Sequence, residues 1–154
     1  MTQNHSSQSS VRAVLAPIAE DMLAVDEILH REFAHSQSPT VTEIGSYIIG
    51  AGGKRMRPAL LMLMARALGY EGTDHRELGA TIEMLHTATL MHDDVVDEGK
   101  MRRGRATANA RWGNNIAVLV GDFMYTRSFE MMIRIGNLRV MQALAQAANT
   151  LSEG

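Results

Sequence analysis

Three aspartates, Asp93, Asp94 and Asp97, stand close together in the middle of the chain. At about 100° per residue on a helix, Asp93 and Asp97 lie within about 40° of each other, and His86 lies about 20° from both, so these three share one face. Asp94 points about a quarter-turn away. A carboxylate cluster suits a hard ion, and magnesium uses one or two carboxylates together with substrate phosphates. The spacing therefore predicts a magnesium ion that bridges to a phosphate.

As pure structure this acidic cluster is unfavourable. Like charges four residues apart destabilise a helix by a few tenths of a kcal/mol, and anions near its C-terminus oppose the macrodipole by about 0.3–1 kcal/mol each. The preceding segment, residues 80–92, carries a single acid, Glu83. A solvated acidic helix end is the alternative interpretation. A calcium EF-hand loop is excluded, because Val95 and Val96 stand where that loop needs oxygen ligands.

Two basic segments flank the aspartates, GGKRMRP at residues 52–58 and KMRRGR at residues 100–105. In the first, two glycines permit close backbone approach at a helix start, and Lys54 and Arg57 supply charge. The segment does not match a Walker A motif, because it lacks that motif's second glycine, which stands several residues after the first, and its Lys-Ser/Thr pair. Each segment alone is compatible with a solvated turn or with charge balance. Together with the aspartates they predict a site for two polyphosphate groups, one held through metal and one held directly.

Composition excludes several classes of protein. The chain has 154 residues, 45% of them hydrophobic, with 15 basic and 17 acidic residues and no cysteine. It is therefore not a disordered chain, a polybasic nucleic-acid binder, a disulfide scaffold or a zinc-thiolate protein. The polar start MTQNHSSQSS is not typical of a signal peptide, and no stretch is apolar enough for a membrane anchor. We expect a cytoplasmic protein with a disordered tail over residues 1–10.

The elements that must position these residues are all predicted to be helices. Twelve methionines and only 5% aromatics favour a helical core. Helical periodicity predicts helices over 11–33, 43–49, 74–98, 112–135 and 138–151, and a helix over 59–68 that is buried all round because it is almost wholly apolar. Asp74 and Glu77 resemble a capping box. No alternating β pattern of useful length is present, so the fold class is all-α.

Four motifs in register now resemble one family. They are GGKRMRP at 52–58, LMHDDVVD at 90–97, MRRG at 101–104 and VGDF at 120–123. In this order and spacing they are similar to the N-terminal half of trans-type (all-E) isoprenyl diphosphate synthases, in particular the octaprenyl-type enzymes of bacterial quinone synthesis. The resemblance covers residues 15–154. It implies an all-α helical bundle of the isoprenoid synthase type, of which residues 11–154 form the N-terminal part.

The resemblance implies a head-to-tail condensation of isopentenyl diphosphate onto an allylic diphosphate such as farnesyl diphosphate. Asp93 and Asp97 would bind Mg²⁺, with Asp94 supporting them, and Arg102 would hold the allylic diphosphate. The diphosphate of isopentenyl diphosphate would be bound by four residues: Lys54, Arg57, His86 and Arg103. The family forms homodimers, so a homodimer is expected.

Two small residues precede the aspartates, Ala88 and Thr89, where short-chain members of the family tend to carry aromatics. Their size predicts an open channel and a product longer than farnesyl, of about eight isoprene units by the resemblance. The alternative is that small side chains only allow close helix packing. His92 is interpreted as a helix-packing residue, and Asp122 as a buried acid.

Two other functions compete with this one. A di-iron carboxylate bundle would use Glu-x-x-His pairs, which occur at Glu27/His30 and at Glu83/His86. A non-catalytic subunit of a prenyl synthase is the other alternative. It is favoured because the family's second aspartate-rich motif is absent from these 154 residues. For that reason we expect this chain alone to have little or no activity.

Overall fold

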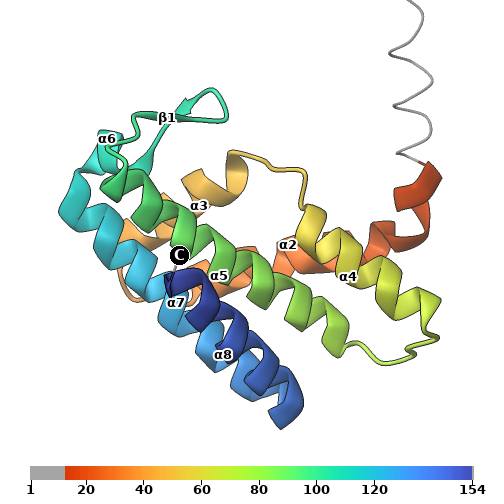
Figure 1. Ribbon diagram of the computed structural model, residues 1–154. Helices are drawn as coiled ribbons and strands as arrows, with labels where there is room; N and C mark the ends of the chain where they lie inside the picture. The colour runs from red at the N-terminus through yellow and green to blue at the C-terminus, as the bar shows by residue number, and fades with distance from the viewer. Residues whose placement is uncertain (1–12, 154) are drawn as a thin grey trace, which may run out of the picture.

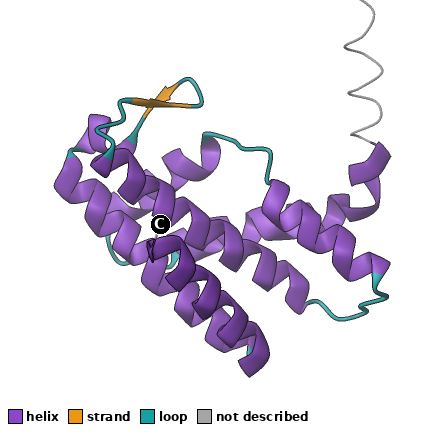
Figure 2. Cartoon of the chain, in the orientation of Figure 1, coloured by secondary structure: helices purple, strands orange, loops and turns teal. Residues whose placement is uncertain are grey.

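The computed structural model describes residues 13–153, and these are almost entirely helical (Figures 1 and 2). A 3₁₀ turn η1 (Ala16–Ile18) leads into α2 (Ala19–Ala34), α3 (Pro39–Gly50), α4 (Met56–Ala67), α5 (Asp74–Val96), α6 (Ala108–Trp112), α7 (Asn114–Ile135) and α8 (Leu138–Glu153). A two-stranded antiparallel hairpin, β1 (Met101–Arg102) and β2 (Arg105–Ala106), lies between α5 and α6. The predicted all-α class is confirmed. The predicted tail, residues 1–10, lies outside the described residues.

The long helices α5 and α7 form the centre of the bundle and run in opposite directions (Figure 1). Their contact is built largely from buried methionines, including Met84 and Met91 of α5 and Met124 and Met131 of α7. Near the aspartate end the two helices approach closely at Gly121, where a Cβ would overlap a side chain of α5. This packing holds the C-terminal end of α5 rigidly against α7.

Local signals explain most helix boundaries. Ser38 caps α3, because its hydroxyl accepts a hydrogen bond from the Val41 N–H, and Pro39 occupies the first turn. The helix therefore starts four residues before the predicted residue 43. Gly113, with φ of 87°, separates α6 from α7, so the predicted single helix over 112–135 is broken at its start. The first helix is likewise not continuous, since η1 interrupts it around Pro17.

The prediction that residues 59–68 are buried all round is wrong. Only one face of α4 contacts the bundle, through Ala59 and Met62, whereas Leu60, Met64 and Leu68 are 63%, 51% and 79% exposed. In Figure 1 the helix lies at the outside of the bundle, along the first half of α5. An apolar run has no period that could reveal which face is covered.

The predicted capping box at the start of α5 does not form. Thr73 occupies the N-cap position without a side-chain hydrogen bond. The Asp74 carboxylate instead accepts from the Tyr70 hydroxyl at 3.3 Å, and Glu77 pairs with Arg134 at 2.7 Å. None of the described helices is both long and apolar enough to cross a membrane.

Candidate functional site

Asp93 and Asp97 are exposed at the C-terminal end of α5. The Asp97 N–H donates to the Asp93 carbonyl at 2.8 Å, which continues the helical turn to Asp97 and keeps the two carboxylates one turn apart on one face. The described residues contain no group of three His, Cys, Asp or Glu side chains placed to hold a metal. Two open carboxylates remain, and they fit magnesium, which takes its other ligands from water and phosphate.

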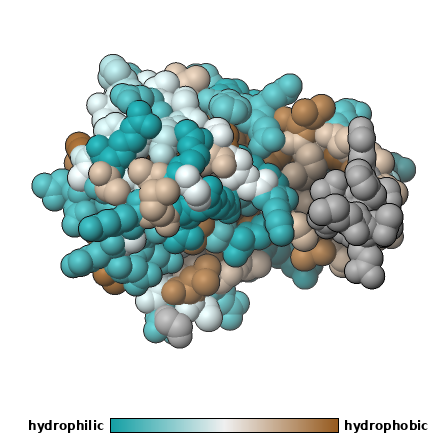
Figure 3. Space-filling view, turned by 90° about the horizontal axis from the view of Figure 1, so that it is seen from above, coloured by the Kyte–Doolittle hydropathy of each residue, from teal (hydrophilic) through white to brown (hydrophobic). Residues whose placement is uncertain are grey.

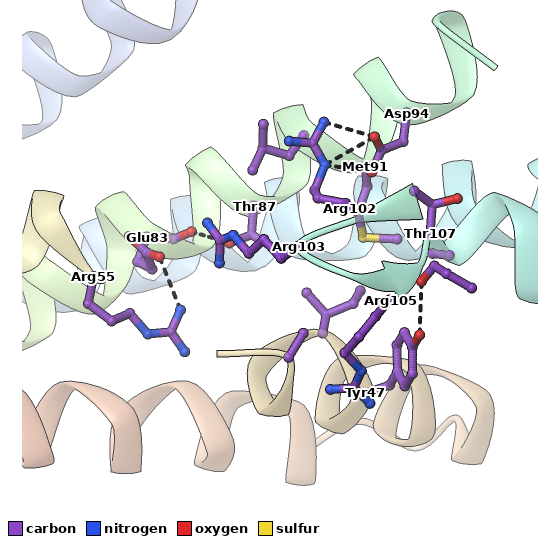
Figure 4. Close-up of a pocket in the computed structure, with 15 residues that line it drawn as sticks. Tyr47, Arg55, Glu83, Thr87, Met91, Asp94, Arg102, Arg103, Arg105 and Thr107 are labelled. Carbon is purple, nitrogen blue, oxygen red and sulfur yellow. Dashed lines mark hydrogen bonds and ion pairs between the residues drawn. The ribbon is translucent and has the colours of Figure 1, made fainter. Parts of the chain in front are cut away.

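Asp94 faces the hairpin and meets Arg102. The Arg102 Nε donates to both carboxylate oxygens at 3.0 Å, and Nη2 donates to Oδ1 at 2.8 Å (Figure 4). The Asp94 side chain is only 14% exposed. The hydrogen bonds that Arg102 donates to Asp94 raise the pKa of the Arg102 guanidinium, and the charges of Asp93 and Asp97 act in the same direction. Arg102 is thereby held, fully charged, beside the open carboxylates.

The hairpin that carries Arg102 is anchored to the end of α5 by side chains that the sequence analysis missed. The Asn109 amide donates to the Asp94 and Gly99 carbonyls, both at 3.0 Å. The Thr107 hydroxyl donates to the Gly99 carbonyl at 2.7 Å, and the Tyr47 hydroxyl donates to the backbone of β2 at 2.8 Å. The signal was Thr107 itself, a helix-capping residue type directly before the short helix α6.

A two-residue turn closes this hairpin. Arg103 and Gly104 have φ angles of 52° and 76°, the left-handed conformation that tight hairpin loops require. The Arg103 guanidinium donates to the Gly52 carbonyl and lies against Gly53, where a side chain would overlap it. The hairpin and the loop before α4 are therefore in contact. A Cβ at Gly53 would overlap the Arg103 guanidinium, whereas Gly52 has space for a Cβ but a left-handed φ of 68°.

The three cations of residues 52–58 divide into two groups. Arg55 has a left-handed φ of 44° and pairs with Glu83 at 3.0 Å and with Asp26 at 3.1 Å. Its side chain is 12% exposed, so it fastens the loop to α5 and α2. Lys54 and Arg57, in contrast, are exposed. The predicted ligand-binding residues of this segment are thus the ones that the fold leaves open.

His86 lies half-buried on α5 among these cations. Burial lowers the pKa of its imidazole, and the positive charges of Arg57, Arg103 and Arg102 lower it further, against the opposing charge of Glu83. These three arginines act on His86 from two other parts of the chain, α4 and the hairpin. The site is therefore assembled from three elements and is strongly positive on the side of His86.

Ala88 and Thr89 have different surroundings. Ala88 is fully buried in the core. Thr89 is half-buried, and its hydroxyl donates to the His86 carbonyl at 2.8 Å. Ala88 therefore fits the alternative interpretation, in which a small side chain only allows close helix packing. Thr89 is the one of the two that remains partly open to solvent.

The di-iron interpretation is wrong. Glu83 is buried and its carboxylate is taken up by Arg55 at 3.0 Å, while Glu27 and His30 are exposed on α2. No group of three metal-ligating side chains forms from them within the described part of the chain.

His92 packs between α5 and α7, as expected. Its ring lies over Gly121, and Nε2 is 3.4 Å from the Val118 carbonyl and 3.3 Å from an Asp122 carboxylate oxygen. Asp122 itself is 61% exposed, so its interpretation as a buried acid is wrong.

Comparisons with known proteins agree with this geometry. The family model for polyprenyl synthetase matches residues 38–154. Octaprenyl diphosphate synthase of Escherichia coli (strain K12) is 50% identical over 136 residues, which cover 88% of this chain and 42% of that protein. An all-trans-nonaprenyl-diphosphate synthase (geranyl-diphosphate specific) of Rhodobacter capsulatus is 44% identical over 142 residues, covering 92% and 43%.

Solved structures show the same fold. A decaprenyl diphosphate synthase from Rhodobacter capsulatus matches with a TM-score of 0.88 and 47% identity, covering 92% of this chain and 43% of that one. A polyprenyl synthase from Caulobacter crescentus CB15, complexed with calcium and isoprenyl diphosphate, matches with a TM-score of 0.87 and 35% identity, covering 91% and 42%. The fold is thus the all-α isoprenoid synthase fold. Within that class, this chain belongs to the polyprenyl synthetase family. It spans less than half the length of the curated relatives it matches.

Proposed function

We propose that this chain supplies the first aspartate motif and the diphosphate-binding residues of a polyprenyl diphosphate synthase. The reaction would condense isopentenyl diphosphate head-to-tail with an allylic diphosphate, farnesyl diphosphate in our proposal, to give an all-trans octaprenyl product for quinone side chains. One observation carries the proposal. Arg102, paired with Asp94 at 2.8 Å, is held beside the open carboxylates of Asp93 and Asp97, which lie one turn apart at the end of α5.

We assign the allylic diphosphate to the side of Asp93, Asp97 and Arg102. Mg²⁺ bound by Asp93 and Asp97 would supply a positive charge that stabilises the departing diphosphate. Arg102 is already oriented by Asp94, so its guanidinium needs little reorganisation to meet the same charge. The calcium and isoprenyl diphosphate in the Caulobacter crescentus structure support a divalent cation beside a diphosphate in this family.

We assign the diphosphate of isopentenyl diphosphate to Lys54, Arg57, His86 and Arg103. Three of these are exposed cations, and a diphosphate lying among them would replace solvent with charge-assisted hydrogen bonds. Because its pKa is lowered, His86 is neutral near pH 7 in the absence of ligand. A bound anion would offset the arginine charges and favour its protonation.

A long apolar product needs an apolar path along α5. Such a path is supported by the exposed apolar face of α4 and by a groove at the far end of α5, lined by Leu61, Met64, Leu68, Leu78, Ile135 and Val140. Thr89 lies at the other end, beside the aspartates, and we propose that it controls entry to this path. Ala88 would act by allowing α5 to pack closely. The protein would work as a homodimer, in keeping with the exposed Leu119 and Ile133 of α7.

The test is incorporation of radiolabelled isopentenyl diphosphate into apolar product by the protein that carries this sequence, with farnesyl diphosphate and Mg²⁺. We expect magnesium-dependent products longer than farnesyl, and their loss in Asp93→Asn. Thr89→Phe should shorten the product while keeping the first condensation. Incorporation that Asp93→Asn leaves unchanged would refute the assignment.

A further inference from the structure

A second pair of arginines, Arg105 and Arg111, meets at Tyr47 of α3, and Arg105 also lines the pocket that Asp94, Arg102 and Arg103 line. Arg102 and Arg105 are cross-strand neighbours, yet in Figure 4 Arg102 extends to α5 while Arg105 lies against Tyr47 of α3. The Arg105 Cζ atom is 4.2 Å from the centroid of the Tyr47 ring. The Cζ atom of Arg111, at the end of α6, is 4.7 Å from the same centroid and 4.5 Å from the Trp112 ring. Two guanidinium groups thus lie over the Tyr47 ring, and one of them also lies over the Trp112 ring.

The aromatic surface formed by these two rings is held in place by the fold. The Tyr47 hydroxyl donates to the Ala106 carbonyl at 2.8 Å, and the ring meets Trp112 edge-on, with centroids 5.0 Å apart and planes at 78°. Both rings are half-buried. The two arginines therefore rest on a surface with little freedom to move, which lowers the entropy that a ligand would otherwise cost on binding.

Neither arginine is neutralised by the described part of the chain. Within residues 13–153, no carboxylate lies within 4.0 Å of the Arg105 or Arg111 guanidinium, and neither guanidinium donates a hydrogen bond there. Seven other arginines do form such ion pairs: Arg31, Arg55, Arg66, Arg76, Arg102, Arg127 and Arg134. A guanidinium that stacks through its face keeps its in-plane N–H donors available. Two charges near one ring also repel each other, and a bound anion would offset that repulsion.

We propose that Arg105 and Arg111, on the surface formed by Tyr47 and Trp112, bind a phosphate dianion at a site separate from Asp93 and Asp97. The planar forks of two arginines match the oxygens of a phosphate monoester or diphosphate, and two positive charges balance a dianion better than a single carboxylate. The phosphate can belong to a soluble compound or to a phospholipid headgroup. The site does not depend on the prenyltransferase assignment.

Trp112 is the only tryptophan of the chain and lies at the proposed site, so its fluorescence reports binding there. The first probe is inorganic diphosphate, titrated without divalent metal at constant ionic strength. We expect a saturable fluorescence change in the wild-type protein. The affinity for diphosphate should be about tenfold weaker in Arg105→Gln and in Arg111→Gln. Of these two arginines, Arg105 does not itself stack on Trp112. The exposed Arg139→Gln should keep the wild-type curve. Equal curves for Arg105→Gln, Arg111→Gln and the wild type would overturn the proposal, as would a change reproduced by chloride.

Vesicles distinguish the two sources of phosphate. The probe is sedimentation with phosphatidylcholine vesicles, with and without phosphatidic acid. Retention that requires phosphatidic acid and Arg111, and that diphosphate competes away, assigns the site to a lipid headgroup. A saturable diphosphate signal without vesicle retention assigns it to a soluble phosphate compound. If neither probe gives an Arg111-dependent signal, the site does not exist.

Discussion

At the N-terminal end of α5, buried Asp21 and Glu32 are each met by more than one arginine, whereas at its C-terminal end Asp93 and Asp97 are exposed. Asp21 accepts from Arg76 at 2.8 Å and from Arg66 at 3.3 Å. Burial raises the pKa of the Asp21 carboxyl, but the hydrogen bonds from these arginines outweigh it, so the pKa lies below its usual value. At this end, the closed end of α5, the charged side chains pair with one another and stabilise the fold.

The C-terminal end uses the same residue types differently. Of the three aspartates there, Asp94 is the one that pairs with a cation within the described residues, Arg102 at 2.8 Å, and this pair orients the cation rather than burying it. Asp93, Asp97, Lys54 and Arg57 remain open. A buried charge without its partner is strongly destabilising, while an exposed one costs little. The closed, N-terminal end of α5 therefore serves stability, and the open, C-terminal end is available for a ligand.

The largest expected effect is at the closed end. Glu32 accepts from Arg134 at 2.7 Å and lies 3.5 Å from Arg31 and 3.9 Å from Arg127, so Glu32→Ala leaves three guanidiniums without this partner. We expect a loss of about 3 kcal/mol in the free energy of unfolding, measured by urea denaturation. The exposed Glu130, paired with Arg127 at 2.7 Å, is the matched control, and Glu130→Ala should cost less than about 0.5 kcal/mol. Equal costs would remove the distinction between a buried and an exposed carboxylate on which the comparison rests.

The next largest expected effect on stability comes from the close packing of α5 against α7 at Gly121. Gly121→Ala places a methyl group into the His92 ring, and we expect it to destabilise the protein by about 1–3 kcal/mol. Gly50→Ala, where nothing lies within 4 Å of a new Cβ, should be neutral or stabilising by up to about 1 kcal/mol. Adding His92→Ala should rescue part of the loss in Gly121→Ala. No rescue would mean that the close approach is not the cause.

Lowering the pH should destabilise the protein through His86. Because the pKa of His86 is lowered in the folded state, the unfolded chain binds a proton first as the pH falls below about 6.5. The stability associated with His86 is therefore complete above that pH and is lost as the pH falls toward the folded-state value. Urea unfolding at pH 7.5, 6.5 and 5.5 should show this loss, and His86→Gln should reduce it. The same slope in His86→Gln would contradict the lowered pKa; His30→Gln controls for loss of a histidine.

Much of the open end is predictable from sequence, because helical period alone places Asp93, Asp97 and His86 on one face. Three features are not. Charge type alone cannot tell that Arg55 is paired inside the fold while Arg57 is open, since the partners Asp26 and Glu83 come from other helices. The exposed face of α4 has no periodic signal, because its residues are nearly all apolar.

The Asp94–Arg102 pair is the third such feature, because it depends on the hairpin between β1 and β2. That hairpin is too short to show an alternating pattern. Its turn is set by Arg103 and Gly104 in the left-handed conformation, and a Gly after a basic residue is a weak signal for it.

The smallest expected effect on stability comes from the open carboxylates. Asp93→Asn with Asp97→Asn removes a like-charge pair near a helix C-terminus, so the free energy of unfolding should stay the same or rise by up to about 1 kcal/mol. Urea denaturation measures this change. A marked loss of stability would show that these aspartates serve the fold, as Asp21 and Glu32 do.

The same double variant gives the most direct test of the central claim, that Asp93 and Asp97 are left open to hold a metal beside a diphosphate. The measurement is calorimetric titration of inorganic diphosphate with and without Mg²⁺, in an Arg111→Gln background so that the proposed second site does not contribute. We predict that Mg²⁺ tightens binding at least about tenfold with both aspartates present and has no effect when both are asparagine. An equal effect of Mg²⁺ on both proteins would contradict the account.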